Sequence, residues 1–277
     1  MKTRIITAIV GILVLIGVMF TFNTMVFNLV IAAITLIAVH EIYNALGFEK
    51  KDWLMYAVLV PYTLLVMLSS YSAMRKLVMP MSFVLVTFFA IYLVVRNGTI
   101  SYQKASGLLV FSGIVIFCFY SFILLKERLP VEKFGYDAVF FILLILCFAW
   151  GGDTCAYFAG RAFGKHKLCP KISPKKTVEG AIGGTLGGIV ASVLVGYLIQ
   201  PVLGTSVSLL HMAMLGLVSA VAGQIGDLSA SLVKRNVGIK DFGKIFPGHG
   251  GVMDRLDSIL FVAPIVYCYF SLVLLAA

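Results

Sequence analysis

Long apolar stretches, interrupted by short polar segments, run along almost the whole chain. A helix needs about 20 mostly apolar residues to cross roughly 30 Å of hydrocarbon. Nine stretches approach or exceed that length, and only the first two are separated by a segment as short as Thr21-Phe-Asn-Thr24. The pattern predicts an all-α, polytopic membrane protein with about nine transmembrane helices, at residues 5–21, 24–46, 53–70, 77–95, 105–125, 136–160, 179–200, 207–233 and 256–276.

The composition excludes an ordinary soluble domain. Hydrophobic residues make up 61% of the 277 residues and charged residues 12%, whereas a soluble domain carries about 25% charged residues. The apolar run that follows Lys2 and Arg4 has no Ala-x-Ala-like exit, so we expect a retained first span. We predict one membrane domain over 1–277, in which 1–135 forms a scaffold and 136–277 the catalytic half.

The basic residues predict the orientation of this domain. With the N-terminus in the cytoplasm, 17 of the 22 Lys and Arg residues lie in cytoplasmic segments and five lie outside. The positive-inside rule favours that arrangement. It also places the two long basic loops, 161–178 and 234–255, on the same, cytoplasmic face of the membrane.

Of the twelve acidic residues, five are singled out because they lie within predicted spans or at their ends. Ionisable groups are costly there and usually have partners and a function. Asp153 shares a helix face with Tyr157 and Arg161, which indicates either a functional carboxylate or a salt bridge that anchors the helix end. The five are Asp153, Glu179, Asp227, Asp254 and Asp257.

Asp227 belongs to a face of small residues. Ser219, Gly223, Asp227 and Ser231 recur every four residues, so this carboxylate can approach another helix closely. A structural hydrogen bond is one interpretation of Asp227. The crowded position near the cytoplasmic end of the span makes it a candidate metal ligand as well.

The loop at 234–255 combines cations, glycines and acids. Lys234, Arg235, Lys240 and Lys244 supply positive charge, and the Gly-rich run at 247–251 lets the backbone approach a ligand. If a helix begins near Val252, Asp254 and Asp257 share one face, and paired carboxylates suit Mg²⁺ bound together with substrate phosphates. His249 is either a phosphate donor or a residue that structures the loop.

The loop at 161–178 ends in Ser173-Pro-Lys-Lys-Thr177. Ser173 before Pro174 predicts a helix N-cap, with Lys175 and Lys176 in a first turn that favours anions. The following span carries a small residue every four positions from Gly180 to Gly196, which predicts a ridge for close helix packing. The sequence contains no Walker A motif and no GxGxxG.

These segments resemble the phosphatidate cytidylyltransferase (CDP-diacylglycerol synthase) family. The signature is Ser231-x-x-Lys234-Arg235, Lys240-Asp241 and Pro247-x-His249-Gly250-Gly251-x-x-Asp254-Arg255-x-Asp257, matched without a gap over 27 residues. Gly-Gly-Asp153, Ser173-Pro-Lys-Lys-Thr177 and Glu179-Gly180 are similar to earlier elements of the family, so the similarity covers roughly residues 150–260.

The resemblance implies the reaction of CTP with phosphatidate to give CDP-diacylglycerol and pyrophosphate, in a bacterial inner (plasma) membrane or an equivalent one. It implies a Mg²⁺-dependent site that uses Asp227 and Asp254, with K⁺ as a candidate second cation. With the residue patterns above, we expect Mg²⁺ to be held by Asp227, Asp254 and Asp257. We expect catalytic roles for these acids with Lys234, Arg235 and Arg255, and substrate binding by Asp153, Ser173, Lys175, Lys176, Thr177, Glu179, Lys240, Asp241, Lys244, His249, Gly250 and Gly251.

The expected partners are CTP, phosphatidate and the lipid bilayer, with no nucleic acid and with a homodimer as a candidate assembly. A related nucleotidyltransferase acting on another lipid phosphate, such as an archaeal isoprenoid ether lipid, has nearly the same pattern. A transporter that uses intramembrane acids is the non-enzymatic alternative. The acids gather at one membrane face beside a Gly-rich basic loop, and no inverted repeat is visible, which favours the enzyme.

Overall fold

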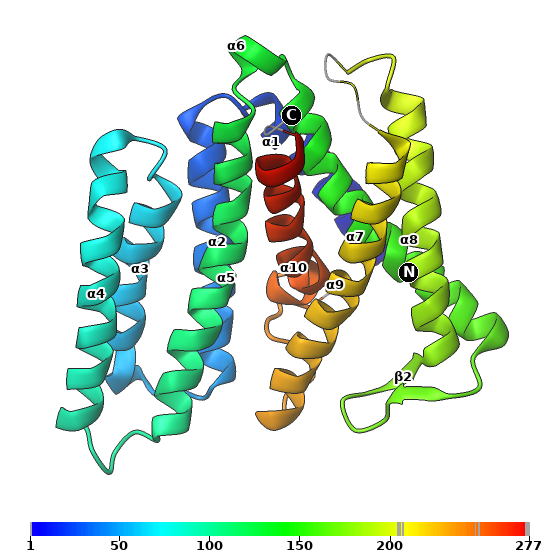
Figure 1. Ribbon diagram of the computed structural model, residues 1–277. Helices are drawn as coiled ribbons and strands as arrows, with labels where there is room; N and C mark the ends of the chain where they lie inside the picture. Colours follow the sequence, from blue (N-terminus) through cyan, green and yellow to red (C-terminus); the bar gives the residue numbers. More distant parts are fainter. Residues whose placement is uncertain (1, 204–205, 207, 247, 249, 275–277) are drawn as a thin grey trace. The chain divides into compact units, whose positions relative to one another are not determined.

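A computed structural model describes residues 2–203, 206, 208–246, 248 and 250–274 and confirms the predicted all-α membrane class (Figure 1). The elements, in chain order, are α1 Lys2–Phe20, α2 Met25–Ala45, the 3-10 turn η1 Lys50–Asp52, α3 Trp53–Met67, α4 Ser72–Val95, α5 Tyr102–Arg128, α6 Val131–Phe134, α7 Asp137–Phe163, β1 Lys167–Cys169, β2 Ser173–Thr177, α8 Val178–Ile199, α9 Leu209–Asn236, α10 Met253–Tyr269 and the π-helical turn η2 Phe270–Leu274.

Each of the nine predicted spans coincides with a helix in the described part of the chain. Seven of these helices (α2, α4, α5, α7, α8, α9 and α10 with its extension to Leu272) are long and apolar enough to cross a bilayer. The 15 residues of α3 cover about 22 Å, which is less than the roughly 30 Å of hydrocarbon. In α1 the described apolar stretch is Val10–Phe20, which is shorter still.

The chain divides into two compact units. One contains Met1–Leu124 with Val237–Arg255, and the other contains Leu125–Asn236 with Leu256–Ala277. The loop between α9 and α10 therefore belongs with the N-terminal helices. The prediction of a single domain over 1–277, with a scaffold half and a catalytic half, stays a prediction.

In the first unit, α2, α3 and α4 pack as successive neighbours. Polar side chains connect these apolar helices at their ends. The Asn28 side-chain amide donates to the Met67 carbonyl at 2.8 Å, and the Ser69 hydroxyl donates to the Tyr120 hydroxyl at 2.8 Å. Inside an apolar environment such groups need partners, so these bonds fix how the helix ends meet.

In the second unit, α8 packs between α7 and α9 through its small residues. The buried residues of α8 are the five of the predicted ridge: Gly180, Gly184, Gly188, Ser192 and Gly196. A Cβ on Gly184 would lie 2.8 Å from the Ala156 Cβ of α7, and one on Gly188 would lie 2.7 Å from the Ala220 Cβ of α9. The prediction of a close helix-packing ridge is confirmed.

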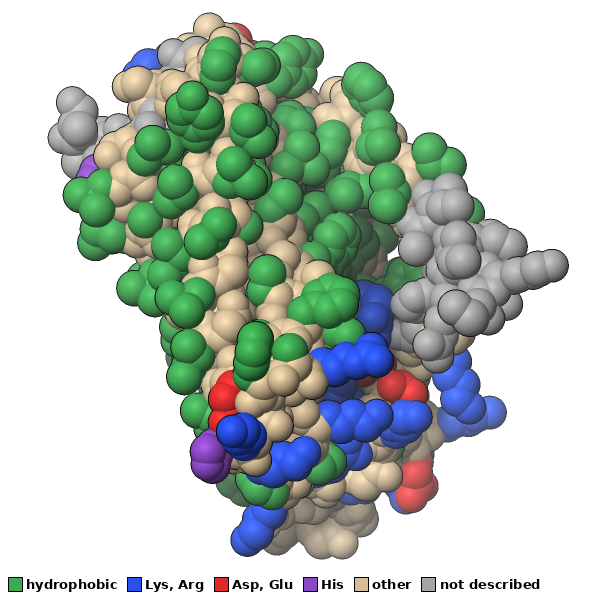
Figure 2. Space-filling model, turned by 90° about the vertical axis from the view of Figure 1, so that its right-hand side faces the viewer, with side chains coloured by type: hydrophobic (Ala, Val, Ile, Leu, Met, Phe, Trp, Pro, Cys, Tyr) green, Lys and Arg blue, Asp and Glu red, His purple; other side chains and the backbone are tan. Residues whose placement is uncertain are grey.

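The opposite face of α8 is apolar and exposed. Figure 2 shows this side of the molecule, where apolar side chains cover most of the surface and Lys and Arg side chains gather at one end. Every fourth residue along this face is 53–65% exposed, as expected for a helix side that contacts lipid. These residues are Ile182, Leu186, Val190 and Leu194.

The segment between α7 and α8 is a β-hairpin, so the predicted helix start at Ser173 is wrong. Residues 173–177 are extended because they pair antiparallel with β1, with Cys169 opposite Ser173 and Lys167 opposite Thr177. The N-cap is Thr177, whose hydroxyl accepts a hydrogen bond from the Gly180 amide at 3.1 Å. The two lysines therefore lie on a strand, where neighbouring side chains point to opposite sides.

Candidate active site

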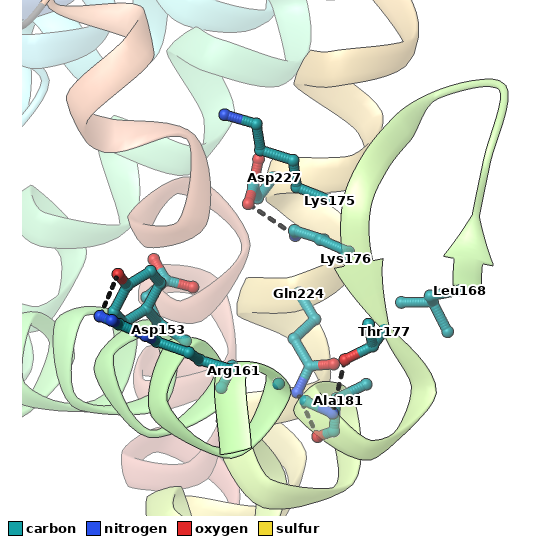
Figure 3. A pocket seen from close by; sticks show the side chains of 13 residues that line it. Asp153, Arg161, Leu168, Lys175, Lys176, Thr177, Ala181, Gln224 and Asp227 are labelled. Carbon is teal, nitrogen blue, oxygen red and sulfur yellow. Dashed lines mark hydrogen bonds and ion pairs between the residues drawn. The ribbon is translucent and has the colours of Figure 1, made fainter. Parts of the chain in front are cut away.

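A cavity of about 460 Å³ opens in the second unit where α7, the hairpin, α8 and α9 meet (Figure 3). Charged side chains reach it from three elements: Asp153 and Arg161 from α7, Lys175 and Lys176 from β2, and Asp227 from α9. The lining residues are Asp153, Ala156, Tyr157, Gly160, Arg161, Leu168, Lys175, Lys176, Thr177, Gly180, Ala181, Gln224 and Asp227.

An ion pair in the cavity joins Lys176 of β2 to Asp227 of α9. The Lys176 ammonium lies 2.6 Å from Asp227 Oδ2, and both side chains are 26% exposed. Figure 3 shows Lys176 extending from β2 toward this carboxylate. Asp227 Oδ1 accepts a hydrogen bond from the Ser231 hydroxyl at 3.3 Å. Asp227 and Ser231, which were predicted to share a helix face, are therefore in contact.

Two further carboxylates lie near Asp227. Asp257 on α10 interacts electrostatically with Asp227, Asp153 and Lys234, and Asp257 Oδ1 accepts from the Ser258 amide at 2.9 Å. The Ser258 hydroxyl donates to Asp153 Oδ2 at 2.9 Å. The structure therefore brings together Asp153, Asp227 and Asp257, three of the five acids singled out in the sequence.

The cations of the site come from several elements. Lys175 and Arg161 line the cavity, and the Arg161 guanidinium donates to the Tyr157 hydroxyl at 3.5 Å. Figure 2 shows a concentration of positive side chains at the end of the unit that carries the hairpin. The exposed cations of this region are Arg161, Lys165, Lys167, Lys171 and Lys175.

Glu179 and Arg235 anchor the hairpin. Glu179, in the first turn of α8, accepts hydrogen bonds from the amides of Lys165 at 3.0 Å and His166 at 3.2 Å, and its Oε1 lies 2.6 Å from the His166 ring. The Arg235 guanidinium donates to the Ile172 carbonyl at 3.2 Å. Both side chains therefore hold the strand that carries Lys175 and Lys176.

The 237–252 loop, which links α9 to α10, folds against the N-terminal helices of the first unit. Asp254 is 6% exposed, and its Oδ2 accepts from the amides of Phe242 at 2.8 Å and Gly251 at 3.0 Å. Gly250 has a φ of +84°, which favours glycine because a Cβ would be strained there. α10 begins at Met253, so Asp254 and Asp257 lie one helical turn apart, as predicted.

The remaining predicted site residues differ in exposure, and one of them lies outside the described part of the chain. Ser173 is half-buried in β2, and Thr177 serves as the N-cap. Lys234 interacts with Asp257. His249 lies outside the described residues, as does Pro247. The exposed residues are Lys240, Asp241, Lys244 and Arg255.

Glu41 is the buried acid that the sequence analysis missed. It lies in α2, is 3% exposed, and contacts the start of α10. The signal was available, because Glu41 is an ionisable residue inside a predicted span, at 24–46, and such residues usually mark a function. Glu41 was nevertheless not among the five acids singled out from the twelve in the sequence.

The carboxylate oxygens of the site are the kind of ligand that Mg²⁺ prefers. Among the described residues, no three His, Cys, Asp or Glu side chains form a group arranged to hold a metal ion. Mg²⁺ usually takes only one or two protein carboxylates and completes its shell with water and substrate phosphates. The neighbouring carboxylates of Asp227 and Asp257 meet that smaller requirement.

Comparison with known proteins now adds an independent line of evidence. The model of the family described as "Cytidylyltransferase family" matches residues 2–273. The chain belongs to this family. Because the match covers both units, the first 124 residues of the chain are part of the family architecture as well, although only their hydrophobicity was evident from the sequence.

Three relatives of the chain carry the name phosphatidate cytidylyltransferase. The protein of Bacillus subtilis is 32% identical over 182 residues, or 65% of this chain and 64% of the relative. That of Haemophilus influenzae is 32% identical over 147 residues, or 52% and 51%. That of Staphylococcus haemolyticus is 30% identical over 275 residues, or 96% and 97%. The first two alignments thus span about half to two thirds of the relatives' lengths.

Proposed function

We propose that this protein is a phosphatidate cytidylyltransferase, which joins CTP and phosphatidate to give CDP-diacylglycerol and pyrophosphate. The observation that carries the proposal is the cavity at the end of the second unit, where Lys176 pairs with Asp227 beside Asp153 and Asp257. Family membership and the names of the relatives support the same reaction.

The reaction requires little acid–base chemistry from the protein. A phosphomonoester has a second pKa near 6, so the phosphatidate phosphate is largely ionised at neutral pH. One of its oxygens attacks the α-phosphorus of CTP, a new P–O bond forms, and the bond to pyrophosphate breaks. The main obstacle is repulsion between two polyanions, so catalysis consists mainly of positioning and charge neutralisation.

The lysines and arginines of the second unit are suited to that task. Lys175, Lys176 and Arg161 line the cavity, and the anchored hairpin holds the two lysines in place. Preorganised cations need no reorganisation as charge develops on the transferred group. Exposed cations on the hairpin would also attract anionic lipid headgroups to this end of the protein.

We also propose that the site binds Mg²⁺. Asp227 and Asp257 would hold the ion together with substrate phosphates, and Asp254 remains the third predicted ligand. The ion would supply positive charge to the triphosphate and to the leaving pyrophosphate. A second cation such as K⁺ and assembly as a homodimer remain expectations from the sequence.

The proposed location is an inner (plasma) membrane with the catalytic loops in the cytoplasm, where CTP is available. The orientation is supported by the charge distribution in the sequence, which puts 17 of the 22 Lys and Arg residues on the same side of the membrane as the N-terminus. The gathering of cations at one end of the second unit agrees with it.

A turnover assay on protein purified in detergent tests this function. Phosphatidate and Mg²⁺ are supplied with each of the four nucleoside triphosphates in turn, and pyrophosphate release and liponucleotide formation are measured. We expect product with CTP, and its loss when Mg²⁺ is chelated. Folded protein that makes product only with another lipid phosphate would change the proposed acceptor, and folded protein inactive with every lipid would refute the enzymatic proposal.

A further inference from the structure

A carboxylate from the N-terminal part of the chain caps the first turn of α10. Glu41 Oε1 accepts a hydrogen bond from the Val252 amide at 3.0 Å, and its Oε2 accepts one from the Met253 amide at 2.9 Å. The first amides of a helix have no partner within the helix, and an anion at this end is favoured by the helix dipole. A side chain some 210 residues away in sequence thus fixes where α10 begins.

The loop backbone fits closely around this carboxylate. A Cβ on Gly243 or on Gly251 would collide with the Glu41 carboxylate group. Both glycines have ordinary φ values, unlike Gly238, Gly248 and Gly250 of the same loop, whose φ values are +73°, +77° and +84°. Gly243 and Gly251 are therefore needed for the space that Glu41 occupies, and not for their backbone conformation.

The same turn also forms a hydrogen bond with Asp254, one of the predicted catalytic acids. Three successive amides, those of Gly251, Val252 and Met253, donate to two carboxylates: the first to Asp254 and the next two to Glu41. Asp254 also accepts from Phe242 at the other side of the loop. Removing Glu41 would leave two buried amides without their acceptor, which is costly, and would free the turn that carries Asp254.

Another buried acid of the same unit has a different role. Asp52 is 4% exposed and pairs with the Arg96 guanidinium at 3.3 Å, and neither residue belongs to the 237–252 loop. Its interaction connects the start of α3 to the end of α4. Asp52 therefore offers a matched control, because its change to an amide removes a buried charge from the same unit without touching α10.

We infer that Glu41 is a positioning residue for the 237–252 loop and for Asp254 in the first turn of α10. The effect on turnover rests on the proposed cytidylyl transfer, whereas the effect on the loop does not. Glu41 acts through the backbone of Val252 and Met253. It is therefore expected to influence kcat by fixing the start of α10, with no contact to the substrate.

The test compares Glu41→Gln with Asp52→Asn in full-length protein, using amide hydrogen exchange and steady-state kinetics. A glutamine keeps one acceptor and places an NH₂ group against the other amide, so one of two hydrogen bonds is lost. We expect at least tenfold faster exchange in peptides covering residues 250–256, with exchange in α7–α9 unchanged. We expect kcat to fall 10- to 100-fold with KM for CTP within threefold, and neither change in Asp52→Asn.

A second pair of variants probes the contact from the loop side. Gly243→Ala alone should displace the Glu41 carboxylate and accelerate exchange at 250–256. In a Glu41→Ala background the added methyl has room, so the double variant should exchange no faster than Glu41→Ala itself. The cycle measures this non-additivity, and Gly243→Ala alone, which keeps the Glu41 carboxylate, still gives a test if the Glu41 variants fail to fold.

The outcomes separate this inference from the proposed function. Fast exchange at 250–256 together with lower kcat supports it, whereas unchanged exchange or unchanged kcat in Glu41→Gln overturns it. Wild-type protein without any turnover would count against the proposed function and the catalytic part of this inference. The exchange data would still decide whether Glu41 holds the loop.

Discussion

Replacing Lys176 by methionine tests the ion pair at the centre of the site. Methionine keeps the length and apolar stem of the side chain but removes the ammonium that lies 2.6 Å from Asp227. If this ammonium neutralises the transferring phosphates, its loss should slow the reaction without unfolding the hairpin, since the backbone pairing of β2 with β1 is unchanged.

The magnitude follows from the exposure of the pair. Removing one preorganised donor from a water-excluded site costs about 10²- to 10³-fold in rate. Both side chains are 26% exposed, so solvent screens part of the interaction and the lower end of that range applies. We expect kcat/KM to fall about 100-fold, which corresponds to about 2.7 kcal/mol in the transition state.

The metal dependence gives a second signature of the same substitution. In the structure the Lys176 ammonium occupies Asp227 Oδ2, one of the oxygens proposed to bind Mg²⁺. Without the lysine, Mg²⁺ no longer competes with an ammonium for Asp227, and the site is more negative. The Mg²⁺ concentration for half-maximal activity should therefore fall, even though the maximal rate is lower.

The assay is CDP-diacylglycerol formation at varied CTP and Mg²⁺, on detergent-purified protein whose melting temperature is measured in parallel. Lys171→Met is the control, since Lys171 is an exposed cation of the same hairpin outside the cavity. Turnover near the wild-type value in folded Lys176→Met would refute the role of this ammonium. Equal losses in both lysine variants would indicate general electrostatic attraction instead.

Three further predictions concern other parts of the protein. Asp254→Asn should abolish activity in protein that still folds, and near-normal turnover would exclude Asp254 from the proposed metal site. Gly188→Ala should lower the stability by about 1–3 kcal/mol, because its Cβ would lie 2.7 Å from the Ala220 Cβ, while Leu186→Ala on the exposed face should have little effect; thermal unfolding in detergent compares them. A cysteine at Lys171 should react with an impermeant maleimide only from the cytoplasmic side, and labelling from the outside would contradict the proposed orientation.

The apolar pattern determined the helices of this protein, because a chain in lipid must satisfy its backbone hydrogen bonds within each segment. Each predicted span therefore coincides with a helix in the described residues, and the four-residue period from Gly180 to Gly196 predicted the buried face of α8 correctly. The positions of Asp254 and Asp257 one turn apart also followed from local sequence, once the start of α10 was placed near Val252.

Local sequence was misleading where two structures compete for the same residues. Ser173-Pro174 has the pattern of a helix N-terminus, but pairing of β2 with β1 makes this segment extended and moves the cap to Thr177. Because α8 begins at Val178, the residue that can cap it is Thr177. Its hydroxyl accepts from the Gly180 amide, which has no partner within the helix. Strand pairing depends on a partner segment, which the local pattern around Ser173 does not contain.

Only the tertiary structure decided which partner each buried or half-buried carboxylate has. The contact between Lys176 and Asp227 joins residues 51 positions apart, and that between Glu41 and Met253 joins residues 212 apart. Sequence showed that such acids need partners in an apolar environment, since an uncompensated charge is costly there. It could not choose the partners, because many cations and amides satisfy a carboxylate equally well and only the packing of the helices brings one of them within hydrogen-bond distance.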